Sequence, residues 1–572
     1  MRLGAWKWLR CLSLQGRSTV QCIPNTGEHP TISLICSSVS HGDPVSNNCQ
    51  HRGKFLHTSA IQVTSKPVQT KSEAVESKWL GLLMNMGDTP HPEDSYIPGA
   101  SRERVKYIRD MLSKAVQAKR TQEGGDLMPN VIAKEVRHLY NELTAQSEKM
   151  AFFLVLEHDL GVDHSNILHL AENLVNVKDT GITAVLRAED RLRQVLEPHY
   201  IQLLSHISRL EGGVKFIVDM RSDLQDGLTS ETQLTARQEL QALSTSIKHL
   251  LAQWFSVGLL DLQRVTWNSP CSVSEKVIRY EAVHPIQGWD DLKRRLAPDR
   301  RCYIFTHRSM PQEPIVVLHT ALEYEISDNI QSILSEPEVD IDDCEYELEN
   351  RTTAIFYSIC STQKGLAGVD LGNFLIKHVV RELQHEFPNI TQYATLSPIP
   401  GFRAWLTLEL KDAIENKDER ALRPPLFRDK EMSGLLRMRS KGGTECAASV
   451  FKELIERDNW HKDQDIIDCI KAPLMRLGTR YLYEEKRRGF AFDQVANFHI
   501  RNGATMWRLN WMADTSARGL HNSLGLMVNY KYVLEDVDNN NQQYLLNGTI
   551  AASKPFLEIL DSETPGNTAR VE

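Results

Sequence analysis

The sequence predicts a multidomain protein in which an N-terminal all-helical bundle is followed by an α/β domain. Two observations predict this fold class. Between residues 101 and 255, apolar residues recur every three or four positions, which is the spacing of one buried face of an α-helix. After residue 256, short runs rich in β-branched and aromatic residues alternate with helical patterns, as in an α/β domain. The 572 residues are enough for two or more domains.

The helical region is defined by periodic apolar stripes that no strand-like run interrupts. The segments with helical periodicity are residues 105–116, 132–143, 149–160, 184–211 and 240–250. Gly161 is expected to end the third of these helices and the pair Gly212-Gly213 the fourth, because glycine favours the backbone that terminates a helix. We interpret residues 95–255 as a helical domain that packs, caps or oligomerises, and we assign it no chemistry.

The α/β region, residues 256–560, is recognised by its β-rich runs. These runs are residues 265–267, 302–307, 315–318 and 354–359. Residues 336–350 hold eight Asp or Glu residues in fifteen positions, which is typical of a solvated loop. Residues 416–446, with one Pro-Pro pair and one Gly-Gly pair, are interpreted as an irregular insertion, and residues 561–572 as a C-terminal tail.

The N-terminal segment differs in charge from the rest of the chain. Residues 1–72 carry a net charge of +6, which leaves −14 for the remainder of a chain whose total is −8. The segment contains Ser, its Arg and Lys residues are interleaved with Trp and Leu in an amphipathic pattern, and its first acidic residue is Glu28. This pattern predicts a mitochondrial transit peptide over residues 1–70, followed by a linker over residues 71–94. A disordered basic tail is the alternative interpretation.

Composition argues against several classes of protein. No apolar run approaches the ~18 residues that cross a bilayer, so we expect no membrane span. The net charge of −8 argues against a general nucleic-acid binder, which needs a basic field. Four of the ten cysteines lie in the predicted leader, and the other six form no Cys-x-x-Cys pair. This spacing argues against a zinc site and against a secreted disulfide framework. We expect inert thiols, with redox activity of Cys271 or Cys302 as the alternative.

A strand, a glycine loop and a helix follow one another between Thr353 and Phe387. The β-rich run is residues 354–359, the loop is residues 363–372 with three glycines, and helical spacing begins near Asn373. Glycines let the backbone approach a phosphate, and free N–H groups at a helix start point toward it. The loop lacks both the Gly-Lys-Ser/Thr pattern and the GxGxxG fingerprint. Taken alone, the segment is explained better by a purely structural strand–helix turn, because glycine so often marks turns.

Two further segments contain polar residues suited to catalysis. Ser397 lies in Ser-Pro-Ile-Pro-Gly, after a β-type run and before a helix expected to start near Phe402. His499 lies in Val495–Gly503, which we interpret as a strand ending in an Asn-Gly hairpin, with the return strand over residues 505–512. Alternation then puts Asn497 and His499 on one face. The structural alternatives are a turn serine and a satisfied histidine.

Taken together, these segments resemble the malonyl-CoA decarboxylase family. The resemblance covers roughly residues 95–560 and rests on long, irregular strings in the same order. They are Ala188–Arg193, Val265–Trp267, Ala282–Pro285, Phe356–Ile359, Gly365–Val369, Leu396–Phe402, Val495–Gly503 and Asn510–Asp514. The glycine segment also resembles the pyrophosphate loop of the GCN5-related acetyltransferase fold, which holds coenzyme A.

The resemblance implies a GCN5-related acetyltransferase-like (GNAT) α/β catalytic domain and a homo-oligomer formed through the helical domain. It puts the catalytic serine on Ser397 and the catalytic histidine on His499, both in contact with substrate. Its acyl-CoA loop falls on Ala367, Gly368, Val369, Asp370, Leu371, Gly372 and Asn373. Asp370 replaces the glutamate of relatives, and the chain ends in Arg570-Val571-Glu572 rather than the peroxisomal Ser-Lys-Leu signal. We therefore expect the mitochondrial matrix as the location.

The implied reaction converts malonyl-CoA to acetyl-CoA and carbon dioxide, and regulates the malonyl-CoA level in fatty acid metabolism. The thioester accepts the carbanion charge as an enolate, so we expect no cofactor or metal. His499 is the expected proton donor, because imidazole titrates near neutral pH. Ser397 is expected to orient the leaving carboxylate or to relay a proton, and Asn497 to orient the imidazole. Tyr532 is a candidate to pack near them, although a tyrosine of the core is the favoured interpretation. The alternatives are an acyltransferase of the same fold and a non-catalytic acyl-CoA sensor.

Overall fold

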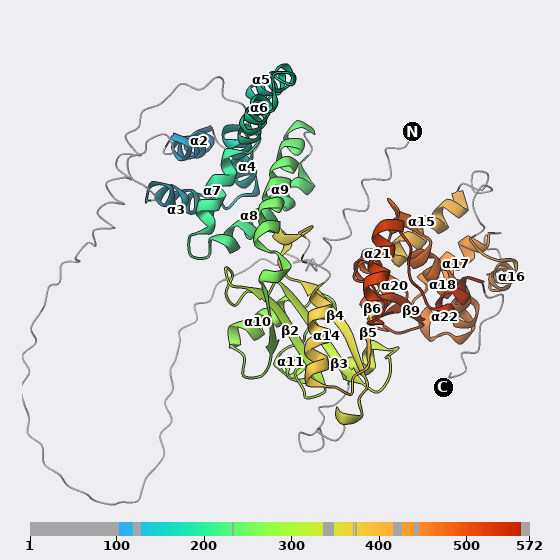
Figure 1. Ribbon diagram of the computed structural model, residues 1–572. Helices are drawn as coiled ribbons and strands as arrows, with labels where there is room; N and C mark the ends of the chain where they lie inside the picture. Colours follow the sequence, from blue (N-terminus) through green and yellow to red (C-terminus); the bar gives the residue numbers. More distant parts are fainter. Residues whose placement is uncertain are drawn as a thin grey trace, which may run out of the picture. The chain divides into compact units, whose positions relative to one another are not determined.

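The computed structural model describes residues 102–117, 127–231, 234–335, 348–369, 371, 374–415, 426–439 and 446–561. These residues belong to one compact unit, Ser95–Glu572 (Figure 1). The predicted leader, linker and most of the C-terminal tail lie outside the described residues. So do most of the acidic segment 336–350 and much of the insertion 416–446.

From Arg102 to Trp254 the described chain is helical and contains no strand, which confirms the all-helical N-terminal region. The helices are α2 (Arg102–Gln117), α3 (Leu127–Glu142), α4 (Gln146–Leu160), α5 (His164–Asn176), α6 (Ile182–Val195), α7 (His199–Ser208), α8 (Gly213–Ser230) and α9 (Leu234–Trp254). Aromatic rings fill the centre of this region. The ring of Tyr140 packs edge-on against Phe152 and Phe216, with centroids 5.1 and 5.4 Å apart.

Two predictions for the helical region are wrong. The single helix over residues 184–211 is two helices, because Pro198 lacks the N–H of a helix interior and instead precedes the first turn of α7. The pair Gly212-Gly213 precedes a helix as well as following one. Gly212 takes a φ of 67° and Gly213 begins α8, a helix that the apolar pattern did not reveal. Its buried residues surround most of the helix rather than forming one stripe, so the periodic signal is weak.

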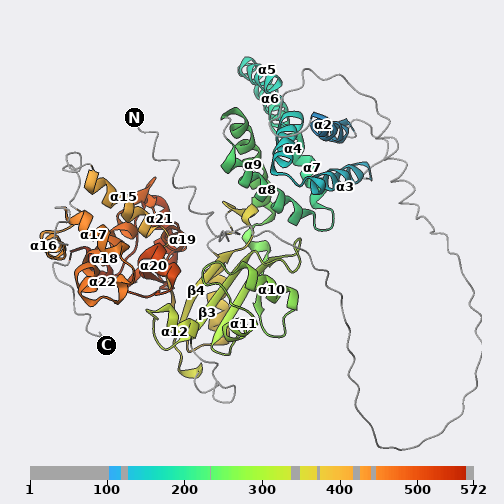
Figure 2. The same cartoon turned by 180° about the vertical axis from the view of Figure 1, so that it is seen from behind.

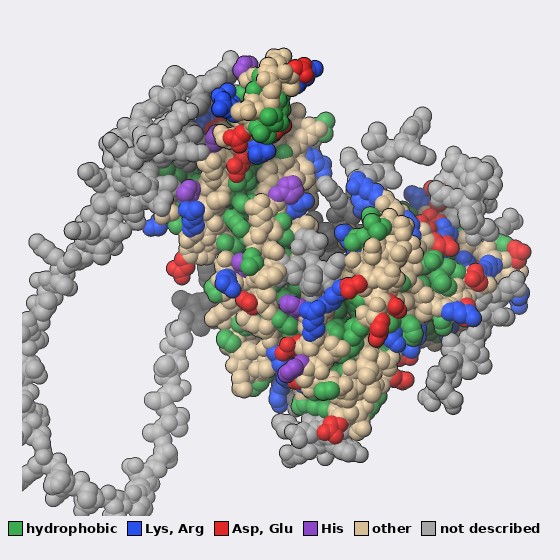
Figure 3. Space-filling model, viewed as in Figure 1, with side chains coloured by type: hydrophobic (Ala, Val, Ile, Leu, Met, Phe, Trp, Pro, Cys, Tyr) green, Lys and Arg blue, Asp and Glu red, His purple; other side chains and the backbone are tan. Residues whose placement is uncertain are grey.

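Helices α5 and α6 pack on each other and leave apolar side chains in solvent. The exposed residues on these helices are Leu168, Val175, Ile182 and Leu186, each more than half exposed. Figure 3 shows hydrophobic side chains on the surface over α5 and α6, at the top of the view. None of the described helices, in either region, is both long and apolar enough to cross a membrane.

The C-terminal region is built on a mixed sheet, as predicted. Its strands within the described residues are β1 (Leu260–Val265), β2 (Arg300–His307), β3 (Val316–Glu323), β4 (Thr353–Ser361), β5 (Gln392–Thr395), β6 (Ser397–Pro398), β9 (Thr505–Asn510) and β10 (Met527–Lys531). They pair in the order β1-β2-β3-β4-β5-β10-β6, with β9 also on β10. Only β4 and β5 among these pairs are parallel, and α14 (Phe374–Glu386) connects them.

Helices cover both faces of the sheet, which explains why β2 is buried along its whole length. On one face, Cys302 and Ile304 pack with α10 (Cys271–Tyr280) and α11 (Trp289–Arg295). On the other face, Arg301 contacts Glu386 and Phe387 at the end of α14. Helix α14 crosses the sheet face seen in Figure 1, and Figure 2 shows the sheet from behind. The predicted strand 354–359 and the helix starts near residues 373 and 402 are confirmed.

The remaining elements are mostly helices. They are α12 (Ile330–Ser335), α15 (Phe402–Glu415), α16 (Asp429–Arg437), α17 (Ala447–Glu456), α18 (Gln464–Tyr483), α19 (Gln494–Arg501), α20 (Ala517–Ser523), α21 (Val537–Asn547) and α22 (Lys554–Asp561), with a small ribbon of β7 (Lys486–Arg487) and β8 (Phe490–Ala491). Helix α16 corrects the prediction that residues 416–446 are irregular. The Glu431 carboxylate in its first turn accepts a hydrogen bond from the backbone N–H of Arg428 at 2.9 Å.

Candidate active site

The glycine loop leaves the sheet at the carboxyl end of β4. A 3₁₀ turn, η4 (Lys364–Leu366), begins the loop, and α14 follows it. Ala367 and Gly368 are exposed, Val369 is buried, and Leu371 is half-buried. The other predicted acyl-CoA residues, Asp370, Gly372 and Asn373, lie outside the described residues.

Ser397 lies two residues beyond the carboxyl end of the neighbouring strand β5, at the start of the short strand β6. The parallel pairing of β4 with β5 ends at Phe356 and Thr395, after which β4 continues against β3 alone and Ser397 pairs with Val528 of β10. The two strands therefore part at this point. Because ligands of parallel sheets bind beyond the carboxyl ends of the strands, the glycine loop and Ser397 lie at the ligand-binding edge of the sheet.

His499 lies on a helix, which corrects the prediction of a strand and hairpin over residues 495–503. Asp493 caps α19 by accepting a hydrogen bond from the Ala496 N–H at 2.8 Å. The buried residues Ala496 and Ile500 are one turn apart and anchor the helix. Gly503 has a φ of 81° and follows the end of the helix, so the Asn-Gly pair serves as a helix stop. The predicted return strand exists as β9, but it pairs with β10.

Ser397 and His499, 102 positions apart in sequence, meet in a hydrogen-bonded chain. The Ser397 Oγ lies 3.2 Å from the His499 Nε2 and donates to the Thr395 Oγ1 at 2.9 Å. The Tyr532 hydroxyl lies 2.9 Å from the His499 Nδ1. Since the serine hydrogen is directed to Thr395, the Nε2–H donates to Ser397 and the Nδ1 accepts from Tyr532. This assignment gives Ser397 and His499 one donor and one acceptor role each, with Thr395 as the terminal acceptor and Tyr532 as the terminal donor.

Ser397 and His499 are buried away from bulk solvent. Ser397 is 5% exposed and His499 is 3% exposed, and the ring of Tyr530 stacks on the imidazole with centroids 4.6 Å apart. Burial lowers the pKa of His499 to about 3 and raises the pKa of Tyr532 well above its ordinary value. At neutral pH the imidazole is therefore uncharged and the phenol protonated. The expectation that His499 titrates near neutral pH is wrong for this buried ring.

Tyr532, not Asn497, orients the imidazole. The expected packing of Tyr532 near the pair is confirmed as a direct hydrogen bond. Asn497 is two residues from His499 on a helix, so it points elsewhere, and its Oδ1 accepts from the Tyr544 hydroxyl at 2.8 Å. Thr395 was not predicted. The only sequence signal for it is its position two residues before Ser397 at the end of a β-rich run.

A second set of contacts fixes the Ser397 turn to the start of α19. Asp493 accepts from the Tyr481 hydroxyl at 3.2 Å through one oxygen, while its other oxygen caps the helix. Gly401, which ends the Ser-Pro-Ile-Pro-Gly turn, lies so close to the Tyr481 hydroxyl that an added Cβ would overlap it. Burial raises the pKa of Asp493 to about 6. Close packing therefore requires glycine at position 401, and this contact joins the Ser397 turn to the residue that caps α19.

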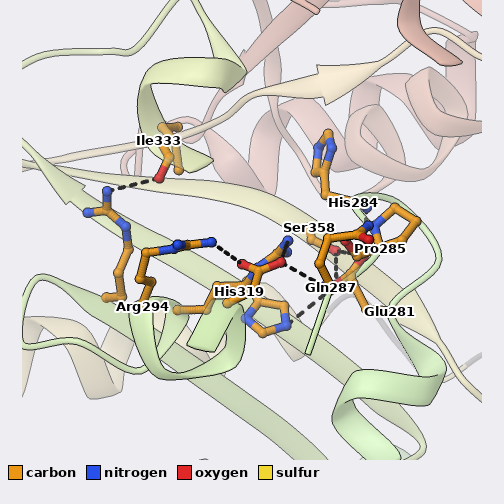
Figure 4. A network of polar contacts seen from close by, with 11 residues as sticks. Glu281, His284, Pro285, Gln287, Arg294, His319, Ile333 and Ser358 are labelled. Carbon is orange, nitrogen blue, oxygen red and sulfur yellow. Dashed lines mark hydrogen bonds and ion pairs between the residues drawn. The ribbon is translucent and has the colours of Figure 1, made fainter. Parts of the chain in front are cut away.

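A buried polar network lies on the opposite face of β4 from α14 and supports the sheet rather than the pair. The carboxylate of Glu281 accepts from the Ser358 hydroxyl at 2.7 Å and from the N–H groups of Val283 and His284 at 2.7 and 2.9 Å (Figure 4). Burial alone would raise the pKa of Glu281, but His319 and these donors hold it below its ordinary value. The network anchors the loop after α10 to β4.

Within the described residues, no three His, Cys, Asp or Glu side chains are placed to hold a metal ion. The cysteines described, Cys271, Cys302, Cys360, Cys446 and Cys469, are all free thiols. Burial raises the pKa of Cys302 above its ordinary value, so this thiol is protonated and unreactive, which corrects the alternative of redox activity at that position.

Comparison with known proteins identifies the family. The family model described as the malonyl-CoA decarboxylase C-terminal domain matches residues 258–570, and the corresponding N-terminal domain matches residues 160–255. The chain belongs to the malonyl-CoA decarboxylase family. The resemblance found in the sequence is thereby confirmed.

Relatives within the malonyl-CoA decarboxylase family are similar over most of the chain. The mitochondrial malonyl-CoA decarboxylase of Anser anser anser is 42% identical over 431 residues, covering 75% of this chain and 82% of the relative. That of Rattus norvegicus is 43% identical over 424 residues, covering 74% and 83%. The crystal structure of malonyl-CoA decarboxylase from Rhodopseudomonas palustris aligns with a TM-score of 0.66 at 31% identity, covering 79% of this chain and 99% of that chain.

Proposed function

We propose that this protein decarboxylates malonyl-CoA to acetyl-CoA and carbon dioxide, and that Ser397 and His499 perform the proton transfer. The hydrogen bond between the Ser397 Oγ and the His499 Nε2, at 3.2 Å in a buried site, is the observation that carries this proposal. Membership of the malonyl-CoA decarboxylase family supports the choice of substrate. As a carboxy-lyase, such an enzyme would set the malonyl-CoA level in fatty acid metabolism.

The substrate supplies the electron sink for the reaction. Breaking the bond between C2 and the free carboxylate releases carbon dioxide and leaves its electron pair on C2, from where it delocalises onto the thioester oxygen. A proton then adds to C2 to give acetyl-CoA. The protein must exclude water, orient the carboxylate and deliver that proton. Because the pair is almost fully buried, a reacting group that reaches it exchanges water for fixed dipoles, which strengthens each electrostatic contact.

The geometry favours a relay of neutral groups over an imidazolium acid. His499 is uncharged at neutral pH, so its Nε2–H is the proton that it has to give. Ser397 passes its hydroxyl proton to C2 and is reprotonated by the Nε2–H, while the Nδ1 takes the phenol proton of Tyr532. An enolate is basic enough to take a proton from a neutral hydroxyl. Water returns a proton to Tyr532 at the end of the cycle, and the hydroxide that remains combines with the released carbon dioxide to give bicarbonate.

The glycine loop is proposed to hold the phosphates of coenzyme A. The exposed backbone at Ala367 and Gly368 supports this role, because a phosphate needs close approach to N–H groups. The loop shares the carboxyl edge of β4 and β5 with Ser397. A GCN5-related acetyltransferase-like fold, implied by the sequence resemblance, is consistent with the parting of β4 and β5 and is part of this proposal.

Two features of the chain support proposals for its location in the cell and for its assembly. We propose import into the mitochondrial matrix, supported by the basic leader and by the relatives named as mitochondrial. We also propose a homo-oligomer formed through the helical region. The exposed apolar residues of α5 and α6 support it, since a second copy would cover an apolar surface that monomers seldom leave in water.

A decarboxylation assay with purified protein and malonyl-CoA alone tests the function. Acetyl-CoA should form without any added acceptor or cofactor. Ser397→Ala and His499→Asn should each lower turnover by ~10²–10⁴-fold while malonyl-CoA still binds, and the double variant should be little worse than the worse single one. Acetyl-CoA that appears only with an added amine would support an acyltransferase. Full activity in either folded single variant would remove that residue from the mechanism.

A further inference from the structure

The helical region holds the glycine loop directly. Arg221 of α8 donates from its Nη1 to the carbonyl oxygens of Gly365 and, at 3.0 Å, Ala367. Its Nε donates to the Ser244 carbonyl of α9 at 3.2 Å, so one buried guanidinium links two helices to the loop. Burial lowers the pKa of Arg221 to about 10, which leaves it charged at neutral pH.

The loop is pressed against the backbone of α8. A Cβ at Gly365 would overlap the Val218 carbonyl, so only glycine fits there. The hydrogen bonds to Arg221 also set the direction of the next peptide group. In a trans peptide the C=O and N–H point in opposite directions, so the Ala367 carbonyl faces Arg221 and the Gly368 N–H faces away from it. No acceptor for this N–H is found among the described residues.

A lysine of the helical region lies beside Gly368. The Cδ of Lys248, on α9, is 3.7 Å from the position that a Cβ on Gly368 would take. Lys248 is half-buried and has no hydrogen-bond or ion-pair partner among the described residues. The nearby cations differ, because Lys364 pairs with Asp226 and Arg221 is occupied by carbonyl groups. Within the part of the chain that the structure describes, Lys248 is thus a cation beside the loop that remains available to a ligand.

We propose that Lys248 binds a phosphate group of coenzyme A together with the Gly368 N–H, so that the helical region forms part of the acyl-CoA site. This inference rests on the proposed function. A flexible ammonium and a free backbone N–H on an exposed glycine are a combination that recognises a phosphate oxygen. Arg221 acts as a positioning residue, because it orients the loop through carbonyl groups and does not reach the ligand itself.

Steady-state kinetics with two substrates test the proposal. Malonyl-CoA carries the pyrophosphate and the 3′-phosphate, whereas malonyl-pantetheine carries neither but has the same reacting group. Lys248→Met should lower kcat/KM for malonyl-CoA by about 10- to 100-fold, the size of one charge-assisted hydrogen bond, with kcat nearly unchanged. The same variant should turn over malonyl-pantetheine like the wild type. Lys248→Arg, which keeps the charge, should recover most of the lost kcat/KM.

Arg237→Met is the matched control. Arg237 lies on α9 eleven residues before Lys248, which is roughly 16 Å along the helix. The variant Arg237→Met therefore removes one positive charge from the same helix, but away from the loop. It should leave both substrates unaffected. Equal losses for both substrates in Lys248→Met, or none for either, would overturn the proposal.

Calorimetric binding of coenzyme A separates this proposal from the proposed reaction. Wild-type protein should bind coenzyme A about 10- to 100-fold more tightly than Lys248→Met, whether or not it releases carbon dioxide from malonyl-CoA. Absence of carbon dioxide release with this difference retained would reject the reaction and keep the phosphate site. Equal affinities would reject the site alone.

Discussion

The neutral state of His499 predicts a specific loss of stability in acid. Burial lowers the folded-state pKa from its ordinary 6.5 to about 3, a difference of about 3.5 pH units. At 1.36 kcal/mol per pH unit, the neutral ring accounts for about 5 kcal/mol of the difference in the free energy of unfolding between neutral and strongly acidic pH. The unfolded chain binds the proton more readily than the folded one. The stabilisation is therefore complete above pH 6.5 and is lost as the pH falls toward 3.

The variant His499→Gln tests this magnitude. Between pH 7.5 and pH 5.0 the histidine alone should reduce the free energy of unfolding by about 2 kcal/mol. His284 and His319, whose pKa values burial lowers to about 4, add similar losses that both proteins share. Urea unfolding at the two pH values should show a loss about 2 kcal/mol smaller in His499→Gln than in the wild type. Equal losses would refute the conclusion that His499 is buried and neutral.

Three further outcomes are expected. Tyr532→Phe leaves the His499 Nδ1 without a donor, so turnover should fall by ~10-fold or more and the free energy of unfolding by about 1–3 kcal/mol, measured by kinetics and urea unfolding. Gly401→Ala should lower the free energy of unfolding by about 1–3 kcal/mol and disturb the Ser397–His499 distance, because the new Cβ meets the Tyr481 hydroxyl. The thermal unfolding temperature and the turnover should then fall together, and an unchanged temperature and turnover would contradict the packing argument. A reporter carrying residues 1–80 should enter mitochondria, and a diffuse cytosolic signal would rule out the leader.

Sequence patterns predicted the sheet better than the active-site helix. Strand β4 is buried on both faces, so its run from Ala354 to Ile359 is apolar except for Ser358 and is easily recognised as a strand. Helix α19 has only eight residues, too few to distinguish a period of 3.6 from a period of 2, and its Asn-Gly ending also suits a hairpin. The helix cap by Asp493 was the signal that would have corrected it.

The meeting of Ser397 with His499 follows from no local pattern. The two residues lie on a strand and a helix that are 102 positions apart in the chain, so composition and spacing place neither near the other. The family resemblance supplied the pair, and the structure supplied its partners Thr395 and Tyr532. Arg221 was missed because one cation among the apolar residues of a helix resembles a solvated position.

The contact between Gly365 and the Val218 carbonyl limits how far this protein can be divided. A fragment that begins at residue 256 would keep Ser397, His499 and every strand of the sheet. It would lack the surface against which the glycine loop is shaped and the guanidinium that fixes two of its carbonyl groups. The helical region thus shapes part of the C-terminal region. We therefore expect the two regions to be inherited, expressed and lost as a single unit.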